Sequence, residues 1–525
     1  MAVDKKSHET KIVSKSLRKI MKGVSLVFFG SVFASIFTFI GRLLVIRHYT
    51  QSDFGVFSLV FSILTIGVVI STLGIERSVI QRIAYSKGKK EFKKIPKFIA
   101  SSIWLCGGAS ILLGAIIFLL SETISKNIFH ESALVIPLRI FSVVIPFLTL
   151  INILVSIFRG FDQMKPTVFF QHLLINTLFS LSLMYLVFFN YPFVNVFYAY
   201  LASILITFIV LVIYIIKHVP FKKILSALST PRPATKELLL FSLPLLGASI
   251  LQLAINWTDV LMIGGIKTIA DVGLYSAARS LAFYISFPLS SLLLIYMPVI
   301  SGLYGGGKID EMKRTFSILT KWLCYFTFPF FLILFLYSET ITRSLFGSSY
   351  LFASATLRVL SLGFIISNFL GPNGATLIAI GKSRFLMFAT LASAILNIGM
   401  NAALIPPFGI EGAAIASVVA VFSINVIKCW HLHSINGAQP LSWNLIKPTL
   451  ASLIIISLIY IILQNFLTVN LWMIPFLLVF CYLIYILAVL LTKSIDEEDL
   501  MMLASIGKKL GIKSPFIGKL LGRFR

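Results

Sequence analysis

The chain has 525 residues, of which 58% are hydrophobic and only 12% are charged, and its mean hydropathy is +0.97. Soluble domains are about 45–50% apolar and about 25% charged, so this composition excludes a soluble enzyme or a disordered protein and requires lipid around the chain. Lys and Arg number 45 against 19 Asp and Glu, a net charge of +26, which would indicate nucleic-acid binding only if the cations formed one patch on a folded surface.

Fourteen apolar runs are each long enough to cross a bilayer as a helix, which takes about 20 residues. In chain order they lie near 24–46, 54–75, 95–120, 135–158, 167–189, 193–216, 238–266, 274–300, 315–337, 357–380, 385–405, 410–433, 447–465 and 471–492. The first run is followed at once by a second and lacks a small-residue cleavage site, so we interpret it as a span and not as a signal peptide. The sequence thus predicts an all-α, polytopic membrane protein with fourteen transmembrane helices.

The cations alternate between the two sides of these spans. Of the 45 Lys and Arg, 37 fall in the tails and loops of one side. Short loops rich in Lys and Arg stay in the cytoplasm, so we expect both termini to be cytoplasmic. Short tails favour the plasma membrane of a prokaryotic cell. The positive charge is therefore mainly a topology signal, and the expected surroundings are membrane lipid and no nucleic acid.

Short motifs recur 218 or 219 residues apart. Asp53–Ser58 recurs as Asp271–Ser276, Trp104–Cys106 as Trp322–Cys324, and Leu138–Ile140 as Leu357–Val359. Because the repeat unit holds six spans, both halves enter the membrane with the same polarity, which predicts two six-helix bundles around a central cleft suited to alternating access. The expected domains are a basic cytoplasmic tail (1–23), two bundles (24–234 and 235–435), two extra helices, 13 and 14 (436–493), and an amphipathic cytoplasmic tail (494–525).

Polar side chains inside the spans are costly, so their position indicates function. The first span carries Thr38 and Arg42 on one helix face, the seventh carries Gln252, Asn256 and Asp259, and the eighth carries Arg279. A single Thr more often has a structural role in a membrane helix, and the arginines could simply snorkel to the interface. Asp259 could pair with Arg279 or Arg42, carry a proton or bind a cation, and these alternatives stay open. Several arginines with few acids favour an anionic cargo such as a phosphate-bearing lipid.

Catalytic, metal and cofactor motifs are missing from the sequence. The four cysteines all fall inside expected spans without ligand spacing, so we expect them to be small apolar core residues. No cofactor is expected, and coupling of transport to a proton or sodium gradient stays open.

Two segments resemble a known family. The stretch from Leu73-Gly74-Ile75 through Arg82–Tyr85 to Lys87-Gly88-Lys89-Lys90 resembles the end of span 2 in the polysaccharide flippases. These exporters of O-antigen and lipid-linked oligosaccharide belong to the multidrug/oligosaccharidyl-lipid/polysaccharide (MOP) superfamily. Tyr296–Ser301, followed by Gly307-Lys308 and Asp310-Glu311, is similar to the matching segment after span 8. The resemblance extends over nearly the whole chain, including the layout of six, six and two helices.

The resemblance implies a cargo and a mechanism. Such a flippase moves polyprenyl-(pyro)phosphate-linked oligosaccharide from the inner to the outer leaflet, by rocking two bundles around a cationic cavity, for surface polysaccharide or glycoprotein glycan assembly. Glycosyltransferases or a polymerase of the same pathway would be its partners. Arg42 and Arg279 correspond to arginines that bind the head group, and Arg77 and Arg82 to an initial capture site at the inner mouth. Asp259 stands where a further cation would suit the cargo better.

Two alternatives stay open. A cation-coupled multidrug exporter of the same superfamily needs an acid-rich cavity, for which Asp259 and Glu76 are the candidates. A membrane-embedded glycosyltransferase or polymerase needs an acidic catalytic pair and a sizeable external loop, and the sequence predicts neither.

Overall fold

The computed structural model describes residues 33–161, 163–218, 232–466, 469–496 and 498–500. These residues form helices and short connections, with no strand among them. They divide into two compact units. The N-terminal unit comprises the described residues up to Ala277 together with Ile398–Ala413, and the C-terminal unit comprises Ala278–Asn397 and the described residues from Ala414 onward. The expected all-α fold is confirmed, whereas the tails expected at 1–23 and beyond residue 500 lie outside the described residues.

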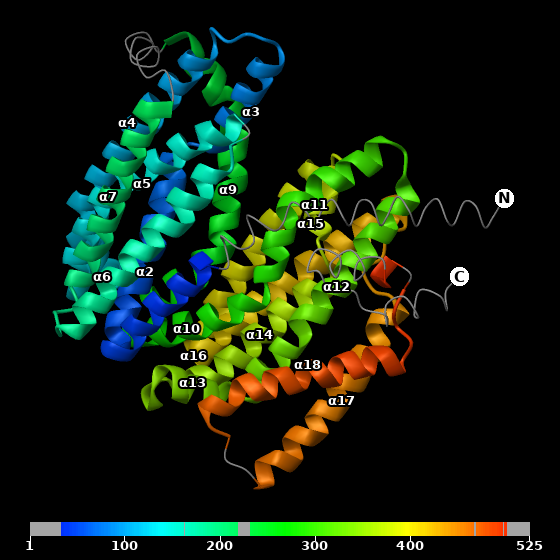
Figure 1. Ribbon diagram of the computed structural model, residues 1–525. Helices are drawn as coiled ribbons and strands as arrows, with labels where there is room; N and C mark the ends of the chain where they lie inside the picture. The colour runs from blue at the N-terminus through cyan, green and yellow to red at the C-terminus, as the bar shows by residue number, and fades with distance from the viewer. Residues whose placement is uncertain (1–32, 162, 219–231, 467–468, 497, 501–525) are drawn as a thin grey trace. The chain divides into compact units, whose positions relative to one another are not determined.

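The N-terminal unit begins with a helix over residues 33–48. It continues with α2 (Gln51–Ser71), α3 (Ile75–Gly88), α4 (Ile95–Thr123), α5 (Val135–Gly160), α6 (Ile175–Phe188), α7 (Asn195–His218) and α9 (Arg232–Ile266). Helix α5 packs on α4, α7, α2 and α3, while α9 packs on α2, α3 and α4 (Figure 1). The first unit is thus a helical bundle that includes the seventh expected span.

The C-terminal unit holds α11 (Phe287–Gly305), α12 (Ile309–Leu336), α13 (Ser338–Phe346), α14 (Ala353–Phe369), α15 (Asn373–Ala379), α17 (Trp443–Phe466) and α18 (Ile474–Leu491). Two helices have residues in both units, namely α10 (Ile269–Ala282) and α16 (Ser383–Asn436). Helix α12 packs against α11, α14, α17 and α18, so α17 and α18 join this unit through α12.

Eleven helical segments of the described chain are long and apolar enough to cross a membrane. Three features account for the difference from the fourteen expected spans. The first expected span is described only from residue 33, and the span expected at 274–300 is interrupted by a 3₁₀ turn at Phe283–Ile285. The spans expected at 385–405 and 410–433 are joined in α16, whose backbone leaves the helical region only at Gly409, with φ of 58°. The number fourteen and the predicted domain boundaries remain predictions.

The second expected span, 54–75, ends earlier than its hydropathy indicates. Helix α2 stops at Ser71, and Leu73 and Gly74 take left-handed conformations with φ of 51° and 71°. A Cβ at position 74 would lie 2.4 Å from the carbonyl oxygen of Ser242 in α9, so glycine permits both the backbone conformation and the close approach of α9. The residues that follow therefore form a separate helix, α3.

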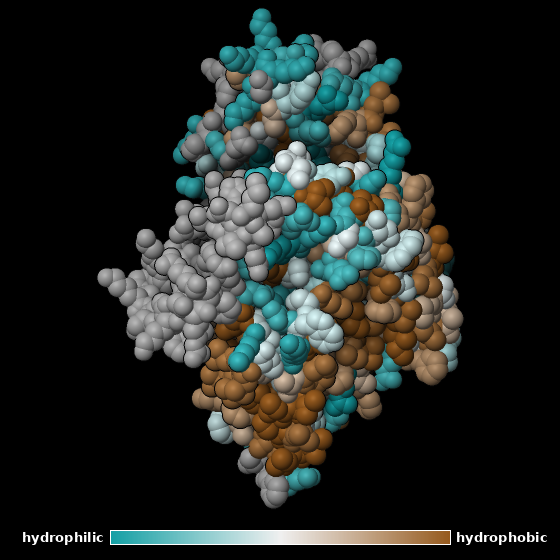
Figure 2. Space-filling view, turned by 90° about the vertical axis from the view of Figure 1, so that its right-hand side faces the viewer, coloured by the Kyte–Doolittle hydropathy of each residue, from teal (hydrophilic) through white to brown (hydrophobic). Residues whose placement is uncertain are grey.

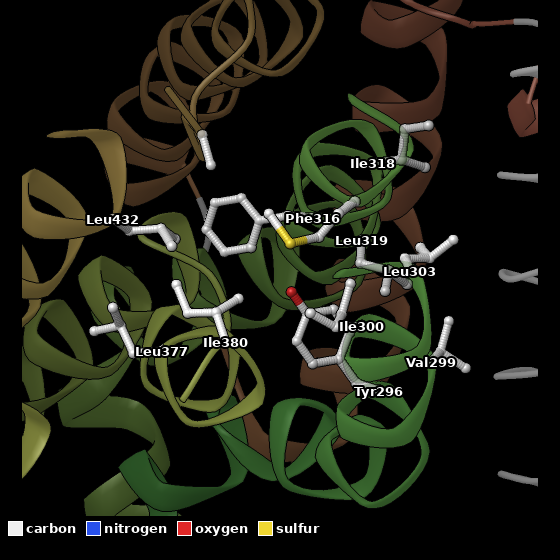
Figure 3. Close-up of a cluster of buried hydrophobic side chains, with 12 residues drawn as sticks. Tyr296, Val299, Ile300, Leu303, Phe316, Ile318, Leu319, Leu377, Ile380 and Leu432 are labelled. Atoms are coloured by element: carbon white, nitrogen blue, oxygen red, sulfur yellow. The ribbon is translucent and has the colours of Figure 1, made fainter. Parts of the chain in front are cut away.

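Each unit has an apolar interior. In the C-terminal unit, Figure 3 shows a cluster of buried side chains from α11, α12, α15 and α16, among them Tyr296, Ile300, Phe316, Leu319, Leu377 and Leu432. The Tyr296 hydroxyl lies 2.7 Å from the hydroxyl of Thr376 in α15, so this buried polar group has a hydrogen-bond partner. In the N-terminal unit, α3, α4 and α5 contribute Ile75, Val79, Ile99, Cys106, Ile153 and Ile157 to a second cluster.

The outer surface of the described helices is also apolar. Brown, hydrophobic side chains cover much of the lower half of the face in Figure 2. The exposed residues of α17 and α18 include Ile454, Leu458, Ile461, Phe476, Leu483 and Leu487. Soluble monomers rarely expose apolar patches of more than a few hundred Å², so this surface is suited to lipid contact and agrees with a multi-pass membrane protein.

Candidate functional site

The two repeated motifs fold in the same way. At the start of α2, the Thr50 hydroxyl donates to the Asp53 carboxylate at 2.7 Å, and the Asp53 amide donates back to Thr50. At the start of α10, Thr268 and Asp271 form the same pair at 2.7 Å, with the same return bond. This reciprocal capping satisfies backbone N–H groups that have no helical partner. The motif Asp53–Ser58 and its copy Asp271–Ser276 thus begin equivalent helices.

These two equivalent helices cross each other near their first turns. A Cβ on Gly55 would lie 1.9 Å from the carbonyl oxygen of Ile269, and a Cβ on Gly273 would lie 2.2 Å from the carbonyl oxygen of Gln51. Both pairs are related by the repeat offset of 218 residues. The contact is therefore symmetric, and it depends on a glycine in each helix because any side chain would separate the two backbones.

A buried carboxylate lies where three helices of the N-terminal unit meet. Asp259 of α9 is only 2% exposed. Its carboxylate accepts a hydrogen bond of 2.6 Å from the Tyr275 hydroxyl of α10 and one of 2.8 Å from the Asn401 amide of α16. Both donors are neutral and buried. A buried charged group needs such partners, so Asp259 is fixed in place by its two neighbours.

The other polar residues predicted on α9 are more open. Gln252 is exposed and Asn256 is half-buried, so exposure falls along this face toward Asp259. The structure thus places the three residues on one helix, and it brings Asp259 together with Tyr275 and Asn401.

The helix over residues 33–48 packs against α6, where the Ser180 hydroxyl donates to the carbonyl oxygen of Phe37 at 2.7 Å. The Thr38 hydroxyl donates to the carbonyl oxygen of Ala34 at 2.8 Å, the usual intrahelical bond of a threonine, which favours a structural role for it. Arg42 follows one turn later and is half-buried.

Arg279 of α10 is also half-buried and follows Tyr275 by one turn. Residues four apart lie on one helix face, so this arginine continues the face of α10 that bears the Asp259 partner. Arg42 belongs to the N-terminal unit and Arg279 to the C-terminal unit.

The two arginines predicted for capture lie on α3 and differ in environment. Arg82 forms an ion pair of 2.8 Å with Glu237 of α9, and its guanidinium lies 5.1 Å from the ring centroid of Phe241. Arg77 is exposed. The charge of Arg82 is therefore partly neutralised by α9, whereas Arg77 faces outward.

Metal binding has no cluster of ligands to support it. Among the residues that the structure describes, no group of three or more His, Cys, Asp or Glu side chains could hold a metal ion. The four cysteines are free thiols; Cys106, Cys324 and Cys481 are buried and Cys429 is half-buried.

Tyr275 and Asn401 were not identified as site residues by the sequence analysis. Tyr275 lies inside the repeated motif Asp271–Ser276, and Asn401 is a polar residue in the apolar run 385–405. These signals mark both residues as unusual. They do not show that either side chain contacts Asp259, because Tyr275 is 16 residues and Asn401 is 142 residues away from it in the sequence.

Comparison with known proteins agrees with this fold. The chain matches the family described as "Polysaccharide biosynthesis protein" over residues 20–303, more than half of its length. The chain belongs to this family. A second match, to the MatE family, extends over residues 244–403. The solved structures that share its fold include a multidrug transporter of the MATE family and a lipid II flippase.

Two relatives and one solved structure illustrate the similarity. The chain is 19% identical to Stage V sporulation protein B of Bacillus subtilis, over 83% of this chain and 87% of that protein. It is 28% identical to the probable low-salt glycan biosynthesis flippase Agl15 of Haloferax volcanii, over 35% of this chain and 38% of that protein. The inward closed conformation of the lipid II flippase MurJ shares the fold, with a TM-score of 0.69, 17% identity and coverage of 91% of this chain and 99% of that one.

Proposed function

We propose that the chain moves a polyprenyl-(pyro)phosphate-linked oligosaccharide from the inner to the outer leaflet of a prokaryotic plasma membrane by alternating access. The observation that carries the proposal is membership of the polysaccharide biosynthesis protein family. Two similar proteins are named as flippases, one for low-salt glycan biosynthesis and one for lipid II. Glycosyltransferases or a polymerase of the same pathway would supply or consume the cargo.

Half-buried arginines suit the head group of this cargo. Guanidinium binds phosphate in a bidentate manner and stays charged at any physiological pH. Arg42 and Arg279 are each placed in an apolar helix with part of the side chain accessible. For initial capture, Arg77 is the better candidate of the α3 pair, because Arg82 is already paired with Glu237.

Asp259 would couple transport to an ion gradient. A buried carboxylate that accepts hydrogen bonds from the neutral side chains of Tyr275 and Asn401 can bind a proton or a sodium ion when the surrounding helices move. Tyr275 and Asn401 would then position the carboxylate, and their helices would respond to its change in charge.

A reconstituted transport assay tests the head-group assignment. Proteoliposomes are loaded with a fluorescent polyprenyl-pyrophosphate-linked disaccharide, and externalised lipid is quenched from outside. Arg42→Ala and Arg279→Ala should each lower the initial rate at least about tenfold, since loss of one charge-assisted bidentate contact costs about 1.5–3 kcal/mol. The matched control is Arg384→Ala, which removes an exposed arginine in the first turn of α16 and should leave the rate unchanged. Equal rates for all three variants would remove Arg42 and Arg279 from the site.

The MatE match over residues 244–403 supports a second candidate, a cation-coupled multidrug exporter. That function would use Asp259 to attract a cationic drug. The same proteoliposomes, supplied with ethidium in place of the lipid-linked sugar, separate the two candidates, since ethidium efflux without sugar-lipid transport would favour the drug exporter.

A further inference from the structure

A small polar pocket lies in the C-terminal unit, and none of the proposed transport residues lines it. It encloses about 120 Å³. Its walls come from the end of α12, from α13 and α14, and from the end of α17, and they comprise Leu336, Tyr337, Glu339, Thr340, Arg358, Tyr460, Gln464 and Val469. The helix ends that form it are those that the distribution of Lys and Arg predicts to be external.

The charged wall of the pocket is an internally neutralised pair. The Arg358 guanidinium donates to the Ser338 hydroxyl at 2.7 Å and to the Glu339 carboxylate at 2.9 Å. Because the carboxylate cancels the positive charge, this wall offers little net attraction to a phosphate. It still presents a donor beside an acceptor, which is the combination that hydroxyl groups require.

Another part of the lining is aromatic with a polar edge. The rings of Tyr337 and Tyr460 meet edge to face, with centroids 5.1 Å apart. The Gln464 amide donates to the Tyr460 hydroxyl at 2.6 Å, which leaves the proton of that hydroxyl to be donated elsewhere. A tyrosine hydroxyl is protonated at neutral pH, so Tyr337 also offers a donor. Tyrosine thus supplies an apolar face and a hydrogen-bonding tip in one side chain.

The first half of the chain contains the same ion pair in a different setting. Arg139 donates to Ser121 at 3.1 Å and to Glu122 at 3.2 Å, as Arg358 does to Ser338 and Glu339. There, the ring of Phe118 covers the guanidinium at 5.6 Å. Around Arg358 it is α17 that supplies Tyr460 and Gln464, and α17 lies outside the six-helix repeat. The repeat therefore provides the ion pair, and the additional helix α17 completes the pocket.

We propose that this pocket binds one neutral sugar ring. Its planar polar groups suit ring hydroxyls, its tyrosines suit the apolar face of a sugar, and its neutral charge disfavours phosphate. Sites for drug-sized ligands have volumes of about 300–1,000 Å³, so a pocket of this size takes a single ring and not a whole oligosaccharide. A role in holding the glycan at the external side rests on the proposed flippase function, but sugar binding itself does not.

Binding is measured on the full chain in nanodiscs by saturation-transfer difference NMR. The probes are methyl α-glucoside, methyl β-galactoside and methyl N-acetyl-β-glucosaminide, each with inorganic phosphate as competitor. At least one glycoside should show transfer that phosphate does not displace. Tyr460→Phe and Gln464→Leu should each weaken that signal at least about threefold, whereas Tyr482→Phe, which makes the same change on α18, should not.

Each outcome decides one inference. No transfer to any of the three glycosides, displacement by phosphate, or equal signals from all variants would overturn the sugar pocket. Sugar binding by a chain that fails to transport the lipid-linked disaccharide would overturn the proposed flippase function and leave the pocket intact. Transport without sugar binding would overturn the sugar pocket and leave the proposed flippase function intact.

Discussion

At the scale of single residues, Asp259 is a position where burial and charge conflict. Its carboxylate is 2% exposed and is held by Tyr275 and Asn401. We predict that Asp259→Asn abolishes the response of transport to a proton or sodium gradient, lowering the gradient-driven rate at least about tenfold. Asparagine keeps the shape of the side chain and an oxygen that can accept the hydrogen bond from the Tyr275 hydroxyl, so the protein should still fold. The measurement is the transport rate in proteoliposomes with and without each gradient.

The matched control for this prediction is Asp271→Asn. Asp271 lies in the first turn of α10, and its carboxylate accepts hydrogen bonds from the backbone amide and the hydroxyl of Thr268. It is not part of the group formed by Asp259, Tyr275 and Asn401. Its replacement should cost up to about 1 kcal/mol of helix stability and leave the gradient response intact. A full gradient response in Asp259→Asn would show that coupling occurs elsewhere.

At the scale of elements, the crossing of α2 and α10 is the contact most sensitive to a small change. Gly55→Ala would place a methyl group 1.9 Å from the Ile269 carbonyl oxygen, which is backbone and cannot rotate away. Overpacking of this kind costs about 1–3 kcal/mol. We expect Gly55→Ala, and the symmetric Gly273→Ala, to lower the temperature of thermal unfolding in detergent.

The control is Gly108→Ala in α4, where a Cβ would meet nothing within 4 Å. Alanine is the better helix former, so this variant should be as stable as the wild-type chain or slightly more stable. If Gly55→Ala unfolds at the same temperature as Gly108→Ala, the helices are not in contact at this point.

Also at this scale, the sequence predicts the helices better than their ends and partners. Apolar runs identify the helical segments because each must bury or face lipid along its whole length. The break at Leu73–Gly74 and the 3₁₀ turn at Phe283–Ile285 depend on neighbouring helices, which a hydropathy pattern does not contain. Lys321 also has partners that the sequence pattern does not reveal. The distribution of cations assigns it to the cytoplasmic side, where an exposed side chain would be expected. In the structure it is 1% exposed and forms ion pairs with Asp496 and Asp499, about 175 residues later.

The candidate site divides in the same way. Arg42, Arg279 and Asp259 are identified from the sequence because charged residues are rare in apolar runs. Their surroundings are a tertiary property. The bond from Asn401 to Asp259 joins expected spans 11 and 7, and the pairing of Arg82 with Glu237 joins α3 and α9. No local pattern specifies which of many distant polar residues becomes the partner.

At the scale of the whole molecule, the distribution of cations predicts which face is cytoplasmic. The prediction is tested with single cysteines in a chain whose four native cysteines are replaced by alanine. Lys89→Cys, after α3, lies in a loop predicted to be cytoplasmic, whereas Tyr191→Cys, between α6 and α7, and Ser348→Cys, after α13, lie in loops predicted to be external. All three positions are exposed.

A membrane-impermeant maleimide applied to intact cells should label Tyr191→Cys and Ser348→Cys, and should label Lys89→Cys only after permeabilisation. The physical reason is that loops rich in Lys and Arg are retained on the cytoplasmic side during insertion. The opposite labelling pattern would show that the chain has the inverse orientation in the membrane. Because Ser348 follows α13, which contributes Glu339 and Thr340 to the sugar pocket, its labelling also decides whether that pocket opens to the side on which a flipped glycan arrives.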